Sequence, residues 1–306
     1  MSRHPDNGHV FPTLKDLIGL RGGARGLELG ARRLALSVQS GGYRSVYRGR
    51  GLEFDEVRIY QPGDAERDID WRVTARRGRP HTKLYREERE RPVLMLVDLG
   101  PGMFFGSRRL KSAQALYAAA SLAWAAEQAG DRVGGVVVAH DGHRVRPARP
   151  RQGAVLALLK TLVELQPRTP RAPVSGLRED GLARLVHMAH PGSLIPVLSD
   201  FQNLGSDGER HLRQLSGHND VLLIQVFDAL EAEPPPPGRY RLGVPGRLVE
   251  LDSGGTARAW RQRFAEQCRR LERLARRLGC PLIPLSTDAA PVPVLARGLI
   301  RHGRAA

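Results

Sequence analysis

The feature that most constrains the fold is a series of short, strongly apolar segments that recur after Arg91 and alternate with helical patterns. The first of them, residues 93–97, contains no polar residue, which is typical of a strand buried on both faces. Further strands are predicted over 133–140, 194–198, 221–227 and 281–285, and helices over 110–124 and 256–278. Alternation of this kind predicts an α/β domain with a parallel sheet and right-handed crossovers.

The chain before Arg91 has a different character, because it is rich in glycine and arginine and has no long apolar segment. Alternating stretches at 34–38 and 56–60 predict half-exposed strands, and residues 11–20 predict one short helix. We therefore divide the chain into an N-terminal tail with a short helix (1–24), a small β-rich region (25–91) and an α/β domain (92–306).

Composition narrows the class of protein. The 48 basic and 32 acidic residues leave a net charge of +16, but only four of the basic residues are lysine. Such a skew toward arginine is typical of GC-rich coding, so two interpretations of the positive charge stay open, a solvated surface and a polyanion-binding face.

Two cysteines exclude a disulfide framework. The absence of a long apolar run or a secretory signal pattern predicts a cytoplasmic protein.

Four of the predicted strands or their flanks lead into an aspartate. In a parallel sheet these positions share the carboxyl edge, where open α/β folds bind ligands. Carboxylates gathered there suit a divalent cation with oxygen ligands. The alternative is that each aspartate ends its strand by starting a turn or capping the next helix. The four residues are Asp98, Asp141, Asp200 and Asp228.

The stretch 49–103 resembles the bacterial family called domain of unknown function 58. The resemblance rests on an ordered string of motifs: Gly-x-Gly-x-Glu-Phe, Arg-x-Tyr-x-x-Gly-Asp, Ile-Asp-Trp, an Ala-Arg pair, and a strand ending in aspartate. It continues through Asp131-Arg-Val-Gly134, Ser199-Asp-Phe201 and Phe227-Asp228. The signature residues are Glu53, Phe54, Arg58, Tyr60, Gly63, Asp64, Arg67, Asp70, Trp71 and Arg76.

This resemblance implies a doubly wound, mostly parallel sheet of the von Willebrand factor A type after a small β-rich element. Such domains often hold Mg²⁺ through Asp-x-Ser-x-Ser, a loop threonine and a later aspartate. Here Asp98 and Asp200 match the two aspartates, and Ser175 is a candidate for the threonine. Gly100 and Gly102 replace the two serines, so we expect Mg²⁺ to bind weakly if at all, and we expect no other cofactor.

The signature region has two interpretations. Its carboxylates, Asp64, Asp68 and Asp70, could serve an enzyme beside the neighbouring arginines, but catalysis by paired carboxylates needs a cleft and separated pKa values. In the structural interpretation these residues form turns, caps and ion pairs, with Trp71 as the apolar anchor beneath them. We favour the structural interpretation. No nucleophile elbow, phosphate-binding loop or zinc-protease motif is present, so we expect a protein that is not an enzyme.

The resemblance further implies a partner, a MoxR-type AAA+ ATPase, and a role as adaptor in protein assembly or maturation. The predicted loop at the carboxyl edge contains Met103, Phe104 and Phe105, which we take as candidates for docking the partner or for folding into the core. Nucleic-acid or anionic-surface binding through arginine-rich faces is the main alternative. A metal-dependent hydrolase is disfavoured because both serines are missing.

Overall fold

The structure is a computed structural model that describes residues 10–29, 52–61, 69–87, 90–172, 176–202, 204–244 and 247–303. The chain forms two compact units. One comprises residues 1–40 and 91–306, and the other comprises residues 41–90. The predicted boundary near Arg91 coincides with the second division between the units.

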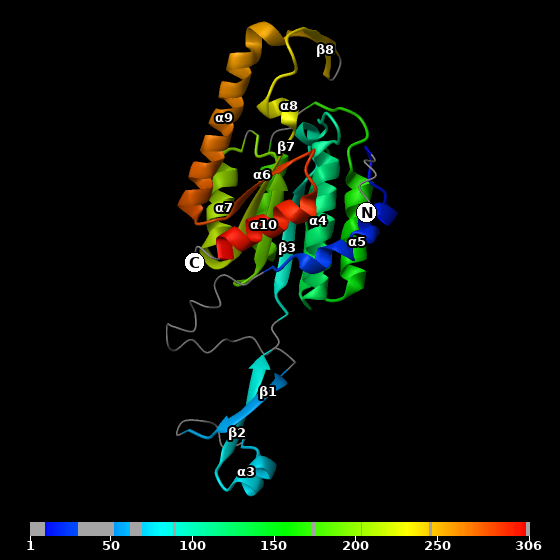
Figure 1. The fold of residues 1–306 in the computed structure, drawn as a ribbon. Coiled ribbons are helices and arrows are strands. Elements are labelled where there is room, and N and C mark those ends of the chain that lie inside the picture. The colour runs from blue at the N-terminus through cyan, green and yellow to red at the C-terminus, as the bar shows by residue number, and fades with distance from the viewer. Residues whose placement is uncertain are drawn as a thin grey trace, which may run out of the picture. The chain divides into compact units, whose positions relative to one another are not determined.

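The larger unit is built on a six-stranded sheet with the order β10-β7-β6-β3-β4-β5 (Figure 1). Five strands are parallel, and β5 pairs with β4 in the antiparallel sense at one edge. This confirms the predicted doubly wound, mostly parallel α/β sheet. The strands are β3 (Pro92–Asp98), β4 (Arg132–Ala139), β5 (Gly142–Arg149), β6 (Leu194–Ser199), β7 (Asp220–Phe227) and β10 (Leu282–Ser286).

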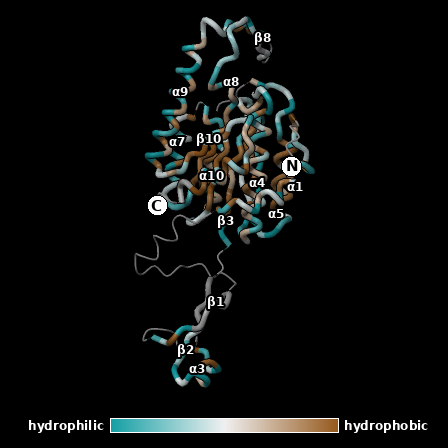
Figure 2. The backbone as a smooth tube through the Cα atoms, in the orientation of Figure 1, coloured by the Kyte–Doolittle hydropathy of each residue, from teal (hydrophilic) through white to brown (hydrophobic). Residues whose placement is uncertain are grey.

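Helices cover both faces of this sheet. One face packs against α4 (Lys111–Gln128), α5 (Gln152–Leu165) and α10 (Pro291–Gly303), and the other against α6 (Leu177–Met188), α7 (Ser206–His218) and α9 (Ser253–Leu278). Figure 2 shows the central strands as the most hydrophobic part of this unit.

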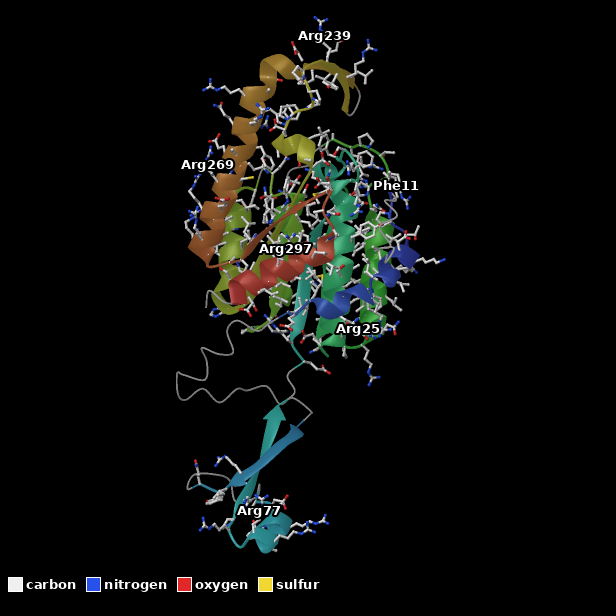
Figure 3. The ribbon with its side chains drawn as sticks, viewed as in Figure 1. Phe11, Arg25, Arg77, Arg239, Arg269 and Arg297 are labelled. Carbon is white, nitrogen blue, oxygen red and sulfur yellow. The ribbon has the colours of Figure 1, made fainter. Side chains whose placement is uncertain are left out.

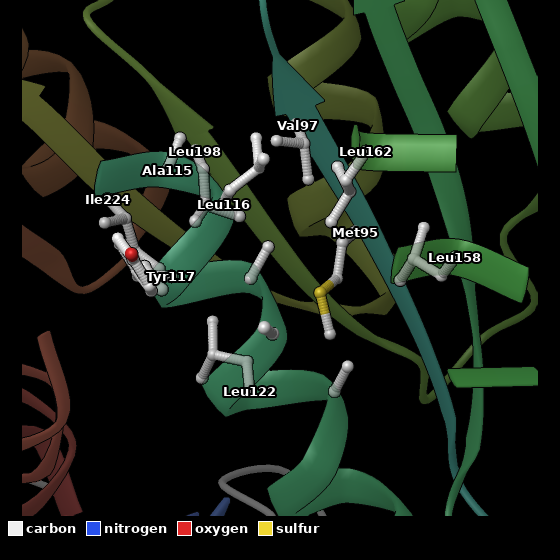
Figure 4. Close-up of a cluster of buried hydrophobic side chains, with 14 of the residues drawn as sticks. Met95, Val97, Ala115, Leu116, Tyr117, Leu122, Leu158, Leu162, Leu198 and Ile224 are labelled. Carbon is white, nitrogen blue, oxygen red and sulfur yellow. The ribbon is translucent and has the colours of Figure 1, made fainter. Parts of the chain in front are cut away.

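Side chains on the two faces of β3 enter different cores, because successive side chains of a strand point to opposite faces of the sheet. Met95 and Val97 point toward α4 and α5, where Figure 4 shows them beside Leu116, Leu158 and Leu162. Leu94 and Leu96 enter the core on the other face of the sheet. The continuous apolar run at 93–97 is therefore required by burial on both faces.

The N-terminal segment is part of the larger unit, although the sequence analysis set it apart as a tail. Helix α1 (Leu14–Gly19) begins at Thr13, whose hydroxyl and backbone form a capping box with Asp16. Leu17 is completely buried in the core, and its carbonyl accepts a 3.0 Å hydrogen bond from Trp124 Nε1 of α4. A short 3₁₀ helix, η1 (Gly23–Gly26), follows and also contacts α4. The predicted strand at 34–38 lies outside the described residues.

The smaller unit contains an antiparallel pair, β1 (Leu52–Ile59) and β2 (His81–Glu87), with helix α3 (Trp71–Arg77) between them in sequence. The strand predicted at 56–60 lies largely within β1. Asp70 caps α3 by accepting hydrogen bonds from the backbone amides of Arg72 and Val73. The helix ends at Gly78, whose φ of +69° favours glycine.

Trp71 is 69% exposed, which corrects its interpretation as a buried apolar anchor. The physical reason is size, because the elements described in this unit, two strands and a seven-residue helix, offer too little apolar surface to enclose an indole ring.

Four short elements complete the described fold: η3 (Pro101–Met103), α8 (Ala229–Ala232), and a separate hairpin of β8 (Arg239–Val244) and β9 (Arg247–Asp252). Within the described part of the chain, no helix has the length and hydropathy that crossing a membrane requires.

Candidate functional site at the carboxyl edge of the sheet

The chain reverses its direction of winding between β3 and β6, and the carboxyl ends of these two strands carry the first two predicted site residues. Asp98 ends β3, and Asp200 directly follows β6. Both are almost completely buried. Ser199 Oγ donates a 2.7 Å hydrogen bond to Asp98 Oδ2, which ties the two strand ends together. The structure therefore places Asp98 and Asp200 at one site, at the switch point where doubly wound sheets bind ligands.

A guanidinium group bridges these two carboxylates. Arg178, in the first turn of α6, has its Nε atom 2.7 Å from Asp98 Oδ2 and one terminal nitrogen 3.2 Å from Asp200 Oδ1. The other terminal nitrogen donates to the carbonyl oxygen of Gln202 at 2.5 Å. All three nitrogens of the planar fork are thus used, which a lysine could not reproduce.

A second cation, which is completely buried, lies on the other side of Asp200. The Nζ atom of Lys111, in the first turn of α4, is 3.0 Å from Asp200 Oδ2 and 2.7 Å from Glu231 Oε1. Lys111 is 1% exposed. Glu231 also accepts from Gln202 Nε2 at 2.8 Å and from the backbone amide of Asp228 at 2.9 Å. Together these residues form one ion-pair network of Asp98, Arg178, Asp200, Lys111 and Glu231.

The network shifts the pKa of Asp98 and that of Lys111 in the directions that favour their charged forms. Burial acts to raise the pKa of the Asp98 carboxyl, but Arg178 and the hydrogen bonds from Ser199 and Gly100 hold it below its ordinary value. Burial acts to lower the pKa of Lys111, but Asp200 and Glu231 raise it above its ordinary value. Opposite charges in contact at low dielectric account for both directions.

The residues present do not fit a resident divalent cation. Two cationic side chains contact the carboxylate oxygens that a metal would need. Gly100 and Gly102 lie where serines would reach the site, since a Cβ atom would come 3.0 Å from Asp98 Oδ1 and 2.8 Å from Asp200 Oδ2, respectively. No cluster of three or more metal-ligating side chains was found among the described residues. Ser175, the candidate third ligand, lies outside them.

The remaining two strand-end aspartates have separate, structural positions. Asp228 follows β7, caps α8 through the amide of Leu230, and accepts from Ser107 and from Thr287 Oγ1. Asp141 is exposed in the turn between β4 and β5. The turn-and-cap interpretation therefore holds for these two, and the binding-site interpretation places only Asp98 and Asp200 together.

The three docking candidates differ in their burial. Met103 is fully buried in the core beneath α4, so it is not available to a partner, which corrects its place among the candidates. Phe104 and Phe105 are half-buried. The short helix η3 turns Met103 inward because its three residues form a single tight turn.

The signature residues lie in the smaller unit. Glu53 and Phe54 are in β1, Arg58 near its end donates to the carbonyl of Ile59, and the backbone amide of Tyr60 donates to Pro80. Arg76 is exposed on α3. The predicted positions Gly63, Asp64 and Arg67, with the ion pairs proposed for them, lie outside the described residues.

Sequence reasoning missed the two cations, Lys111 and Arg178, and also Glu231. The one available signal was that Lys111 is among only four lysines in a chain that otherwise uses arginine. Arg178 has no such signal among its many neighbours of the same type.

The fold and this edge define a doubly wound α/β domain whose ligand edge carries internal ion pairs. The chain belongs to the family described as protein of unknown function DUF58, which it matches over residues 56–273. It is 30% identical over 272 residues to uncharacterized protein Rv1480 of Mycobacterium tuberculosis strain H37Rv and to uncharacterized protein Mb1516 of Mycobacterium bovis, covering 86% of this chain and 84% of each relative.

Solved structures similar to this chain include BatB, a conserved hypothetical protein from Bacteroides thetaiotaomicron, and a von Willebrand factor type A protein from Catenulispora acidiphila. BatB is 15% identical with a TM-score of 0.41, over 69% of this chain and 98% of BatB. The Catenulispora protein is 11% identical with a TM-score of 0.40, over 73% of this chain and 43% of that protein.

Proposed function

We propose that this DUF58 protein is a non-enzymatic interaction module in the cytoplasm, acting as adaptor or partner of a MoxR-type AAA+ ATPase in protein assembly or maturation. One observation carries the proposal: the carboxylates at the ligand edge are paired with two cations of the same chain, the buried Lys111 and the partly buried Arg178. The identity of the partner comes from the family resemblance.

The charge state of this edge argues for recognition rather than catalysis. A general acid or base works best when its pKa lies near the operating pH. The pKa of Asp98 is held below its ordinary value, and that of Lys111 is raised above its own, so both move away from neutrality. Arg178 and Lys111 also contact the carboxylate oxygens that a metal-dependent hydrolase of this fold would need for its ion, which supports the proposal. What remains at this edge is a rigid scaffold for surface loops.

Side chains suited to protein contacts are found in both units, each considered by itself. Trp71 is an exposed aromatic residue on α3, with Arg72 and Arg76 exposed on the same short helix. Tryptophan and arginine are the residue types most enriched at the energetic centres of protein interfaces. In the larger unit, Phe104 and Phe105 leave part of their rings accessible at the carboxyl edge.

The direct test is capture of a purified MoxR-type ATPase, taken from a gene adjacent to this one, by the full chain in the presence of ATP. We expect Trp71→Ala, and separately Phe104→Ala with Phe105→Ala, to weaken capture by about tenfold or more. Ile300→Ala removes another exposed apolar side chain and should not change capture. Failure of the unmodified chain to bind the ATPase would overturn the proposal.

A second function has one observation in its favour. Helix α9 contains eight arginines and two glutamates, and Arg258, Arg269 and Arg273 are exposed on it. Such a stripe suits nucleic acid or an anionic surface. Salt-resistant, nanomolar binding of duplex DNA that disappears when these arginines are reversed in charge would put this function first, because non-specific binding is typically only about 10⁻⁴ to 10⁻⁶ M.

A further inference from the structure

One end of the smaller unit is both apolar and basic. Ile59, the last residue of β1, pairs with His81, the first residue of β2, and the connection between these two residues contains α3. The backbone amide of Asp70, which precedes α3, donates to the carbonyl of His81 at 2.8 Å. Figure 1 shows α3 at this end of the β1–β2 hairpin. Ile59 and residues 71–80 together are called here the α3 tip.

Two large apolar side chains of the α3 tip are exposed to solvent. Trp71 is 69% exposed and Ile59 is 54% exposed. The start of β2 lies between Ile59 and residues 69–70, so these backbone segments are about 10 Å apart, twice the spacing of neighbouring strands. Ala75, one helical turn after Trp71, is exposed as well. The α3 tip therefore leaves apolar side chains in water at two nearby points.

The α3 tip also carries four exposed arginines, and none of them forms an ion pair with another residue in the described part of the chain. No acidic residue occurs between positions 71 and 82. The side chain of Asp70 is used in capping α3. The four are Arg72, Arg76, Arg77 and Arg79, of which Figure 3 labels Arg77. Positive charge on this helix and the turn after it is therefore uncompensated, which makes it complementary to an anionic surface.

The combination of an exposed indole ring, an exposed aliphatic side chain and uncompensated arginines fits an anionic lipid bilayer. Tryptophan is favoured at membrane–water interfaces because its ring is apolar with one polar edge. Basic side chains are attracted to anionic headgroups within a Debye length. Stable attachment takes two signals, apolar insertion and a basic cluster, and the α3 tip supplies both.

Other anionic ligands fit the α3 tip less well. Single-stranded nucleic acid is held by bases that stack on aromatic rings, which Trp71 can provide and the aliphatic Ile59 cannot. A folded protein would need a separate pocket for each of the two apolar side chains, whereas fluid acyl chains adapt to both.

We propose that the α3 tip binds the anionic surface of a phospholipid bilayer, with Trp71 and Ile59 inserted among the headgroups and the arginines against the lipid phosphates. The inference goes beyond the proposed function, because it gives the interaction module a lipid-binding side. For a protein in the cytoplasm, the surface in question is the anionic inner leaflet.

The test is sedimentation of the full chain with vesicles of phosphatidylcholine and phosphatidylglycerol in a two-to-one ratio, and with vesicles of phosphatidylcholine alone. We expect binding to the anionic vesicles that weakens as salt is added. Trp71→Ala and Arg76→Glu should each weaken this binding by about tenfold or more, and Ile59→Ala by a smaller factor. Because these side chains are exposed, the variants should keep the circular dichroism spectrum of the parent.

Matched controls come from the larger unit. Leu248 is 70% exposed, so Leu248→Ala removes an apolar side chain as accessible as Trp71. Arg269→Glu makes the same change of charge as Arg76→Glu, on α9, where Figure 3 labels Arg269. Each control should change vesicle binding by less than about twofold.

Insertion of the indole ring has its own readout. Lipids brominated in their acyl chains quench the fluorescence of a tryptophan that reaches them. We expect bound Trp260→Phe, which keeps Trp71, to be quenched, and bound Trp71→Phe to lose this quenching.

Three results would overturn the proposal: no binding to the anionic vesicles, equal binding to the neutral vesicles, or equal losses in Arg76→Glu and Arg269→Glu. Binding of single-stranded DNA that depends on Trp71 and is tighter than vesicle binding would assign the α3 tip to nucleic acid instead. The vesicle assay contains no ATPase, so its outcome is independent of ATPase capture. A Trp71→Ala variant that loses ATPase capture and keeps vesicle binding would assign the α3 tip to the protein partner and overturn the lipid proposal alone.

Discussion

The ammonium group of Lys111 lies 3.0 Å from Oδ2 of Asp200, and the two side chains are 1% and 2% exposed. The pair joins the first turn of α4 to the end of β6, two elements that are far apart in sequence and adjacent at the switch point of the sheet. Because Lys111 also contacts Glu231, one cation links three segments of the chain. In this protein, cationic side chains therefore contact the carboxylates that other domains of this fold type can use to bind a metal ion.

We predict that Lys111→Met strongly destabilises the protein. Removing Lys111 takes away the cation that contacts Glu231 and leaves Asp200 with Arg178, which it shares with Asp98. Loss of one partner of a buried pair typically costs about 3–5 kcal/mol in the free energy of unfolding. Lys160→Met is the matched control, because Lys160 and Glu164 form an exposed pair worth less than about 1 kcal/mol. Urea unfolding followed by circular dichroism measures both. Equal effects of the two substitutions would contradict the role given to Lys111.

Divalent metal ions should affect the unmodified protein differently from a variant that lacks the cationic side chains of Lys111 and Arg178, called here the cation-free variant. In the unmodified chain, millimolar Mg²⁺ or Ca²⁺ should barely shift the melting temperature, because Lys111 and Arg178 occupy the carboxylate oxygens. In Lys111→Ala with Arg178→Ala, the freed carboxylates of Asp98, Asp200 and Glu231 should bind the ion. A concentration a hundred times the dissociation constant adds about 2.7 kcal/mol of stability.

Thermal unfolding with and without each ion, or ion-dependent refolding if the variant is unfolded, provides the measurement. Adding Asp98→Asn and Asp200→Asn to the cation-free variant should abolish the response. A large shift in the unmodified chain that Asp98→Ala removes would instead show a working metal site.

In the loop that contains Met103, Phe104 and Phe105, substitutions should distinguish one core residue from two partly exposed residues. Met103→Ala should lower the free energy of unfolding by about 2–5 kcal/mol, as is usual for a fully buried side chain. Phe104→Ala with Phe105→Ala should cost less per side chain, since both rings are half-buried, and the folded variant should lose ATPase capture. A double variant that keeps both stability and capture would remove these phenylalanines from the interface.

Ionisation of the Asp131 carboxyl should lower the free energy of unfolding as the pH rises from about 4 to 6. Burial raises its pKa to about 6, despite the opposing hydrogen bond from the Arg91 amide and the charge of Arg91. An unfolded aspartate titrates near 3.9, so between these values the folded state holds a proton that the unfolded state has lost. The penalty is complete above the folded pKa and absent below the unfolded one.

Asp131→Asn keeps an acceptor for the Arg91 amide and removes the buried charge. We expect it to stabilise the protein by roughly 1–3 kcal/mol at pH 7.5 and by almost nothing at pH 4. Unfolding free energies of both proteins across this range isolate the effect, with Asp141→Asn as the control for an exposed aspartate. A difference between Asp131→Asn and the parent that does not vary with pH would refute the assignment.

The fold was largely predictable because its signals are local. A strand buried on both faces must be apolar at every position, as in β3, and a helix on the sheet must repeat its apolar residues every three or four positions, as in α4. Edge elements carry weaker signals. Strand β5 has only one covered face and contains three arginines and a proline, so it was not predicted as a strand.

The sequence by itself determined the parallel α/β sheet, the change of character near Arg91 and the strand ends that carry Asp98 and Asp200, since strands and their ends follow from patterns of a few residues. The doubly wound arrangement was predicted through the family resemblance, which rests on an ordered string of motifs. Only the tertiary structure decided what those carboxylates contact. Arg178 lies 80 residues from Asp98, and Lys111 lies 89 residues from Asp200. No periodicity marks such partners, because an ion pair depends on the side chains that packing brings within about 3 Å. The exposure of Trp71 was decided in the same way, by how much surface the neighbouring elements could cover.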